Sequence, residues 1–170
     1  MSNREHMEKP DFMSEEEWAW IKDRTATVAR ITEDAQADVA RYLANPDGWS
    51  TGAGSPSGLP TLLLTTIGRK SGEQRTTPLV FLKDGEEMVV VGSLAGYDRH
   101  PAWYLNIKAN PQCWAQLDRR KMTVAHRDAS EEQRKALWPR LDKVFPAWGF
   151  FQKQTDRPFP IVILTPTGPA

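Results

Sequence analysis

The sequence lacks several features that would assign it to a class at once. Its 170 residues contain one cysteine, Cys113, which excludes an intramolecular disulfide framework and is typical of a reducing cytoplasm. Lys plus Arg and Asp plus Glu both number 22, so the net charge is zero, whereas proteins that bind nucleic acid are normally basic. No apolar run reaches membrane-spanning length, and the charged N-terminus does not resemble a signal peptide. We therefore expect a cytoplasmic protein with no nucleic-acid partner and no integral membrane segment.

Familiar catalytic and metal-binding patterns are also missing. His6, His100 and His126 have neither the spacing of metal ligands nor a carboxylate close by in sequence, so we expect no metal site. No Ser–His–Asp arrangement and no pair of catalytic carboxylates can be assigned. An enzyme with such a sequence would depend on a cofactor for its chemistry.

What the sequence does contain is a change of hydrophobic period near residue 60. A capping box at Ser14 and Glu17 opens a helical pattern that continues to about residue 43, as one helix or two. A linker rich in Gly, Ser and Pro extends to residue 58. Beyond it, the pattern predicts a short helix starting at Pro101 and another helix opened by a second capping box at Ser130 and Gln133. It predicts strands at 61–67, 75–83, 87–93, 112–117, 121–127 and 161–165.

Two prolines lie inside these predicted elements. Pro78 indicates an edge or a bulge in the second strand, and Pro139 indicates a kink or a restart in the last helix.

About six mainly antiparallel strands with inserted helices predict an α+β protein built on a small β-barrel. We expect a helical extension with its linker at 1–58 and a barrel domain that binds the cofactor at 59–170.

The turn after the first strand is the most informative segment. It places Arg69 and Lys70 beside Ser71 and Gly72, and Arg75 follows as the next strand begins. Cations and outward-pointing N–H groups in such a turn form a cradle for an anion. For an isolated turn, a solvated hairpin with cations for solubility is an equally good interpretation. The flanking apolar strands and a second small-residue loop at 92–96 favour a planar cofactor that carries a phosphate.

Two groups of aromatic residues are candidate pocket walls. The predicted helix at 101–109 places Trp103 and Asn106 on one side; such helices usually only pack, but a buried Asn106 amide would need partners. Phe145, Trp148 and Phe151 recur three residues apart, which is usual for core residues. Breaks in the pattern at 146 and 149 make a pocket wall an equal alternative.

With these residues, the sequence resembles the deazaflavin-dependent nitroreductase family of split β-barrel enzymes, which use coenzyme F-420 (8-hydroxy-5-deazaflavin). The matching segments occur in family order from residue 62 to the C-terminus, whereas the N-terminal helical segment lies outside the resemblance. They are 63–72, 75, 78–79, 101, 103–106, 108–111, 127–129, 138–139, 155–157 and 160–162.

The resemblance implies positions for the cofactor and the substrate. The implied cofactor-binding residues are Arg69, Lys70, Ser71, Gly72, Glu73, Gln74, Arg75, Thr77, Pro78, Ser93, Leu94, Ala95, Gly96, Ala102, Trp103 and Asn106. Substrate would contact Val80, Phe145, Trp148 and Phe151, where the nitroimidazole-reducing branch of the family has tyrosines. Ser93 then remains as the obvious catalytic hydroxyl. Loss of the phenols favours flat apolar acceptors.

The function implied is hydride transfer from reduced F-420 to a small-molecule electron acceptor. Activated alkenes (enones and lactones) and quinones are favoured over nitroaromatics. An FMN-dependent split-barrel oxidoreductase and a non-catalytic F-420 carrier are the two alternatives. The N-terminal helices are either a lid or a peripheral membrane contact, and the protein is either a monomer or a homodimer.

Overall fold

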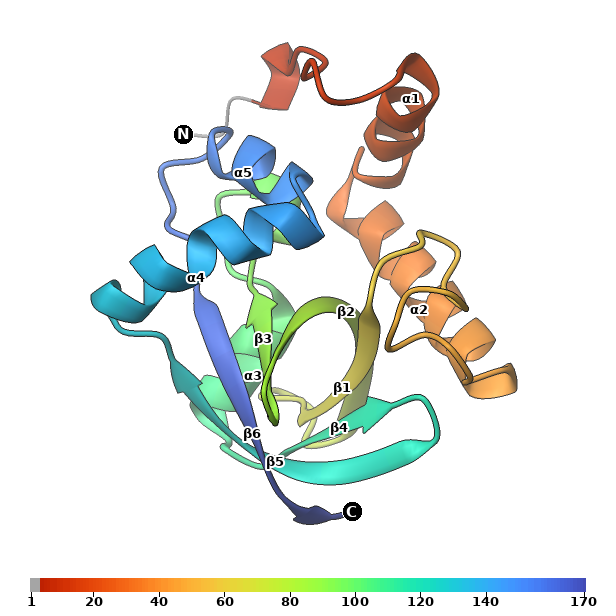
Figure 1. Cartoon of the computed structure of the whole chain (residues 1–170), viewed down its shortest axis with the longest axis vertical. Helices are drawn as coiled ribbons and strands as arrows, with labels where there is room; N and C mark the ends of the chain where they lie inside the picture. The colour runs from red at the N-terminus through yellow and green to blue at the C-terminus, as the bar shows by residue number, and fades with distance from the viewer. Residues whose placement is uncertain (1–3) are drawn as a thin grey trace.

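The computed structural model describes residues 4–170, so the first three residues of the predicted extension lie outside the described residues. Within them, six strands close into a barrel in the order β1-β2-β3-β6-β5-β4, and every pairing is antiparallel (Figure 1). This confirms the predicted α+β class and barrel. The strands are β1 (Thr61–Ile67), β2 (Gln74–Asp84), β3 (Glu87–Val91), β4 (Cys113–Leu117), β5 (Arg120–Asp128) and β6 (Ile161–Pro169).

The predicted first helical stretch is two helices, α1 (Glu15–Arg24) and α2 (Val28–Ala44). They are separate because Thr27 caps the second helix, its hydroxyl accepting a hydrogen bond from the N–H of Arg30. Pro139 does not restart its helix, which is continuous from residue 131 to residue 144. The remaining helices are α3 (Ala102–Ala109), α4 (Glu131–Val144) and α5 (Ala147–Gln152), with short 3-10 segments η1 (Arg4–His6) and η2 (Leu94–Gly96).

Apolar side chains lie on both faces of the strands. On β1, Leu62 and Leu64 point into the barrel, whereas Leu63 packs outside it against Tyr42 and Trp49. Strands β3 and β6 alternate in the same way, one set filling the barrel and the other packing beneath α4 and α5. Both faces are covered, which explains why these strands read as continuous apolar runs rather than alternating ones.

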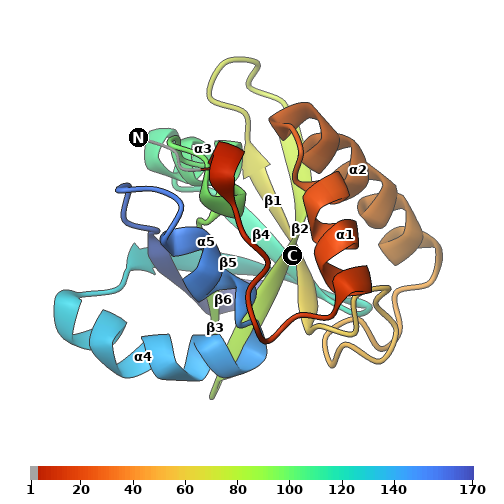
Figure 2. The ribbon, with the colours of Figure 1, turned by 90° about the horizontal axis from the view of Figure 1, so that it is seen from above.

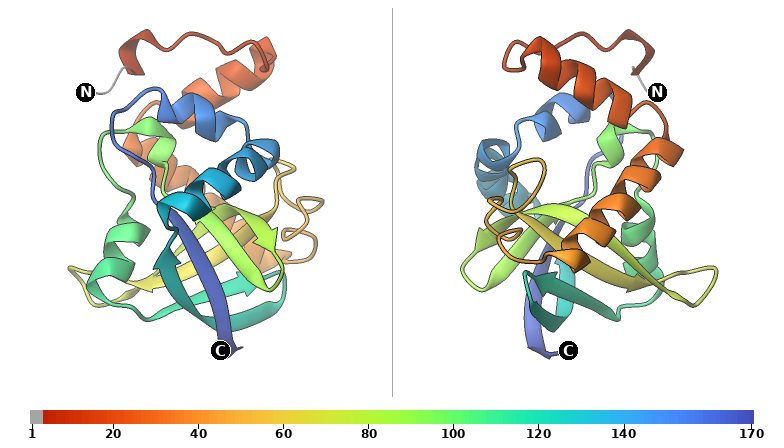
Figure 3. Two further views of the ribbon diagram at one scale, coloured as in Figure 1. Left: turned by 60° about the vertical axis from the view of Figure 1, so that its left-hand side comes forward. Right: turned by 90° about the vertical axis from the view of Figure 1, so that its right-hand side faces the viewer.

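The helices flank the barrel in two groups. Seen from above, α1 and α2 lie on one side of the barrel and α4 and α5 on the other (Figure 2). Helix α2 packs against β2, and the segment before α1 crosses the top of the molecule above α5 (Figure 3). No helix in the described part of the chain has the length and apolar character needed to cross a bilayer.

Tyr42 fixes α2 to the barrel. Its hydroxyl accepts a hydrogen bond from the N–H of Asp118 at 2.9 Å and lies 3.2 Å from the carbonyl oxygen of Gln116. Burial raises the pKa of Tyr42 to about 12, so the phenol stays protonated and keeps both bonds at neutral pH. The anchored helix forms one side of the site described next. A boundary at residue 58 between two domains stays a prediction.

Candidate functional site

A cavity of about 490 Å³ lies where α2, the β1–β2 turn, the loop after β3 and the start of α3 come together. Most of the predicted cofactor residues line it: Arg69, Lys70, Ser71, Arg75, Thr77, Pro78, Ser93, Leu94, Ala95, Ala102, Trp103 and Asn106. The other four do not line the cavity: Gly72 and Glu73 lie in the β1–β2 turn, Gln74 begins β2, and Gly96 lies in the loop after β3. Segments far apart in sequence therefore meet at one site. Their contact with a cofactor stays a prediction.

The β1–β2 turn is a tight loop that only glycine permits at two positions. Gly72 has a φ of 72°, and its N–H donates to the carbonyl oxygen of Gly68 at 2.8 Å. A side chain at Gly68 would place its Cβ only 2.6 Å from the Ser71 hydroxyl and 3.2 Å from the carbonyl oxygen of Glu73. The two glycines thus make the turn tight, and Arg69, Lys70 and Ser71 lie next to one another in the lining of the cavity.

The charge of this turn is largely unbalanced. Arg75 lies 3.3 Å from Glu73, in an ion pair whose side chains are both well exposed and which therefore contributes little to stability. Arg69 and Lys70 are exposed and have no acidic partner among residues 4–170. One end of the cavity is therefore positive and free to receive an anion.

Asn106 holds the turn against α3. It is 4% exposed, its side-chain oxygen accepts a hydrogen bond from the N–H of Arg69 at 3.1 Å, and its amide nitrogen donates to the Thr66 hydroxyl at 3.1 Å. The buried amide thus finds its partners on β1 and on the β1–β2 turn. Asn106 lines the cavity and also fixes the backbone that carries Arg69.

Replacing Asn106 by leucine is expected to weaken binding of F-420, the cofactor that the family resemblance implies, by about tenfold, because a part-buried N–H left without a partner costs roughly 1–3 kcal/mol and frees the turn. Quenching of cofactor fluorescence measures the affinity. Asn110→Ala is the matched control: its side-chain oxygen also accepts from a backbone N–H, that of Gln112 at 3.1 Å, but away from the cavity. Equal affinities for both variants would contradict a role of Asn106 in shaping the turn.

The loop after β3 forms another wall of the cavity, in an unusual conformation. Leu94, Ala95 and Gly96 have φ values of 40°, 48° and 79°, and the first two are non-glycine residues in the left-handed region. The N–H groups of Leu94 and Ala95 donate to no acceptor in the described part of the chain. The Ser93 side chain does not cap this turn. Two residues that line the cavity therefore carry backbone N–H groups without an acceptor in the described part of the chain.

A second cavity, of about 700 Å³, adjoins the first at Pro78, which lines both. Its walls are mainly apolar and come from α1, the loop before β1, β2 and the α4–α5 connection. Val80 and Phe145, two of the predicted substrate residues, line it. Trp148 and Phe151 do not; each is 4% exposed and belongs to the core cluster against which Val80 and Phe145 pack.

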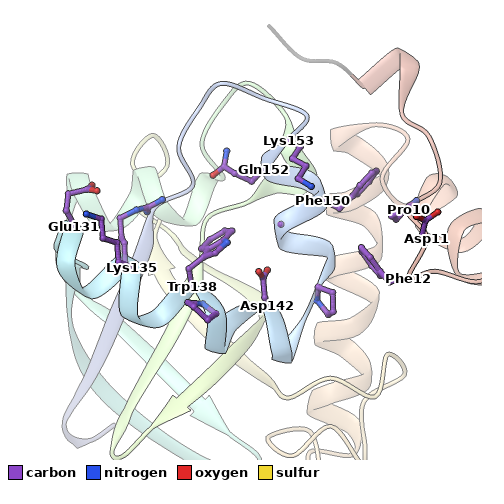
Figure 4. A pocket seen from close by; sticks show the side chains of 14 residues that line it. Pro10, Asp11, Phe12, Glu131, Lys135, Trp138, Asp142, Phe150, Gln152 and Lys153 are labelled. Atoms are coloured by element: carbon purple, nitrogen blue, oxygen red, sulfur yellow. The ribbon is translucent and has the colours of Figure 1, made fainter.

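A wider groove of about 1010 Å³ lies between α4, α5 and the segment 10–12 (Figure 4). Trp138 and Phe150 face it from the two helices, and Phe12 from the N-terminal segment. Its charges are mixed, with acidic and basic side chains in equal number: Asp11, Glu131 and Asp142 against Arg134, Lys135 and Lys153. None of the predicted site residues lines this groove.

Sequence reasoning missed one wall of the first cavity, which α2 supplies through Ile31, Thr32, Ala35 and Gln36. The Gln36 side chain also donates to the carbonyl oxygen of Thr76 on β2 at 3.3 Å. Thr32 and Ala35 recur at helical spacing in the pattern that continues to about residue 43, and the small side chains of this stripe were the available signal. Nothing in the stripe shows which part of the barrel it meets.

The model of the family described as F420H(2)-dependent quinone reductase matches residues 27–166. A Mycobacterium tuberculosis protein, named as a candidate F420H(2)-dependent quinone reductase, is 36% identical over 115 residues, covering 68% of this chain and 97% of that protein. A second M. tuberculosis protein, named F420H(2)-dependent quinone reductase, is 33% identical over 113 residues, covering 65% of this chain and 76% of its own length.

Two solved structures are similar throughout their own length. A structure titled as F420-H2 dependent reductase (FDR-A) has a TM-score of 0.57 and 33% identity, covering 62% of this chain and 93% of that one. A structure titled as a domain-swapped dimer also has a TM-score of 0.57, with 29% identity, and covers 76% of this chain and 99% of that one.

Proposed function

The chain belongs to the F420H(2)-dependent quinone reductase family and is an F420H2-dependent oxidoreductase, and we propose that its acceptor is a quinone. One observation carries the proposal. A cavity with a cationic end and an apolar end adjoins a second, mainly apolar cavity at Pro78. The first suits an anionic cofactor with a flat ring, and the second suits a flat apolar acceptor beside it.

The residues of the first cavity fit coenzyme F-420. Arg69, Lys70, Ser71 and Arg75 would hold its phosphate and acidic tail through charge-assisted hydrogen bonds. Ser93 and the free N–H groups of the same loop would receive polar atoms of the ring system, with apolar contacts from Pro78 and Trp103. When bound, F-420 supplies two electrons together as a hydride from a ring carbon.

The protein then has to orient the two reactants and exclude water. Pro78 would separate the cofactor cavity from the acceptor, and Val80 and Phe145 would set the shape of the space that the acceptor fills. Neither residue offers a hydroxyl, which favours quinones over acceptors that need a nearby phenol. The Ser93 hydroxyl is the candidate donor of the proton that the reduced acceptor requires.

The test is a panel of acceptors mixed with reduced F-420 and followed by the return of oxidised-cofactor absorbance. We expect naphthoquinones and benzoquinones to be reduced faster than cyclohexenone, an unsaturated lactone or a nitroaromatic compound. Tight binding of F-420 without oxidation by any quinone would instead indicate a carrier. Stronger fluorescence quenching with FMN than with F-420 would indicate a flavin enzyme.

We also propose a cytoplasmic location and a small-molecule acceptor as the only partner needed for turnover. The one cysteine, Cys113, is a free thiol, which is consistent with a reducing compartment. Burial raises the pKa of this thiol to about 11, which makes it unreactive. The N-terminal helix α1 lines the acceptor cavity, which supports its role as a lid over the substrate.

A further inference from the structure

Arg157 binds the loop that forms one wall of the first cavity, although it does not line that cavity. Its guanidinium donates to three carbonyl oxygens: to that of Gly92 at 2.9 Å, of Ser93 at 2.7 Å and of Tyr97 at 3.0 Å. These acceptors lie on both sides of the left-handed run 94–96. One side chain therefore joins the two ends of the loop.

The loop needs such a restraint. Leu94 and Ala95 have positive φ values, a conformation that costs non-glycine residues of order 1–3 kcal/mol and persists only when the surroundings impose it. Within the loop, the N–H groups of Gly96 and Tyr97 donate to the carbonyl oxygens of Ser93 and Leu94, each at 3.0 Å. From outside it, Arg4 donates to the carbonyl oxygen of Ala95.

The direction of the carbonyls decides the direction of the N–H groups that follow them. In a trans peptide the C=O and the next N–H point in opposite directions. Because the carbonyls of Gly92 and Ser93 point toward Arg157, the N–H groups of Ser93 and Leu94 point away from it. Ser93 and Leu94 both line the cavity, and their N–H groups have no acceptor within residues 4–170.

The guanidinium is itself held in place. Arg157 lies over the ring of Phe159, 5.0 Å from its centroid, and Nη1 is 3.2 Å from Nδ1 of His100. Burial, and then the charge of Arg157, lower the pKa of His100, so the imidazole is neutral and accepts this hydrogen bond. The Thr155 hydroxyl accepts from the N–H of Arg157 and donates to Asp98, which fixes the backbone of the same segment.

We propose that Arg157 is a positioning residue for the cofactor: it aims the backbone N–H groups of Ser93 and Leu94 at hydrogen-bond acceptors of the bound ring system. The proposal rests on the first cavity being the F-420 site. No other described side chain donates to the carbonyls of both Gly92 and Ser93. The side chains of Gln and Lys lack the planar guanidinium, whose nitrogen atoms donate to three carbonyl oxygens at once, so neither residue at 157 can replace these contacts.

Arg157→Gln is expected to raise the Kd for F-420 by about tenfold, with the KM of the quinone changed less than about twofold because the loop does not line the acceptor cavity. Arg134→Gln is the matched control. Arg134 is also half-buried and donates to a carbonyl of the same C-terminal segment, that of Phe159 at 2.5 Å, but not to the loop. It should leave the Kd for F-420 unchanged.

A second substitution separates positioning from general stability. Glycine adopts positive φ without strain, so Ala95→Gly added to Arg157→Gln should restore most of the lost cofactor affinity. A merely structural role of Arg157 predicts no such recovery. If Arg157→Gln does not fold, Arg157→Lys, which keeps the charge but loses the fork, should weaken binding in the same direction and be rescued in the same way.

Hydrogen exchange without cofactor tests the loop independently of function. In Arg157→Gln, the amides of Gly96 and Tyr97 should exchange at least about tenfold faster than in the unmodified protein. Unchanged exchange, an equal loss of affinity in Arg134→Gln, or no recovery with Ala95→Gly would each overturn the proposal. If the unmodified protein does not bind F-420, the proposed function fails, while the exchange rates still decide whether Arg157 holds the loop.

Discussion

Replacing Arg69 and Lys70 together by glutamine is expected to weaken F-420 binding by about a hundredfold or more, because each charge-assisted contact contributes roughly 1.5–3 kcal/mol. Both side chains are exposed, so their substitution leaves no buried group unpaired. The thermal midpoint should therefore change little while the affinity falls. Fluorescence quenching gives the Kd, and a scan of unfolding gives the midpoint.

The dependence on salt provides a second measurement of the same change. Binding of an anionic cofactor to exposed cations weakens as salt screens the charges. The Kd of the unmodified protein should therefore rise with ionic strength, and the double variant should show a flatter dependence. Arg75→Ala should have a smaller effect than the double change, since Arg75 already lies 3.3 Å from Glu73.

The β4–β5 turn offers a matched control for the anion cradle. Arg120 and Lys121 are also adjacent exposed cations at a hairpin of the barrel, and neither lines the first cavity. Arg120→Gln with Lys121→Gln removes the same net charge from the protein. Loss of affinity in both double variants would show that only overall charge matters, and unchanged affinity in both would place the phosphate elsewhere.

The parts of this structure that follow from local sequence could be predicted. The capping boxes at Ser14 and Ser130 form as expected, with hydrogen bonds in both directions. Pro78 lies where β2 pairs only with β1, since its pairing with β3 begins at Phe81, so the edge that the proline indicated is present. The β1–β2 turn could be picked out because its glycines and cations lie next to one another in sequence, and it does line the first cavity; its contact with an anion stays a prediction.

What could not be predicted depends on contacts between distant segments. Phe145, Trp148 and Phe151 share a spacing of three, yet only Phe145 reaches the second cavity, because it lies in the α4–α5 connection whereas Trp148 and Phe151 on α5 are buried in the core cluster. The wall supplied by α2 and the hold of Arg157 on the loop 92–97 likewise arise from docking. The helical pattern shows that α2 exists but not which part of the barrel it meets, and nothing near Arg157 in sequence indicates which loop it binds, although Arg157 lies in a matched family segment.

A large side chain that fills the second cavity is expected to abolish most quinone reduction and to leave the affinity for F-420 unchanged. Val80 is half-buried on β2 and lines the second cavity but not the first. Val80→Trp places an indole in the space where the acceptor would lie, and displacing a reactant by about 1 Å can cost roughly a hundredfold in rate. We expect kcat/KM for a naphthoquinone to fall by about that factor, with the Kd for F-420 unchanged.

Leu82 provides the control for this substitution. It lies two residues further along β2, so its side chain is on the same face of the strand, and it is half-buried against the same core cluster. It does not line the second cavity. Leu82→Trp should therefore cause a similar loss of stability from overpacking but a small loss of kcat/KM. Equal losses of turnover would mean that β2 tolerates no tryptophan on this face, and a raised Kd for F-420 in Val80→Trp alone would place the cofactor ring, rather than the quinone, beside Val80.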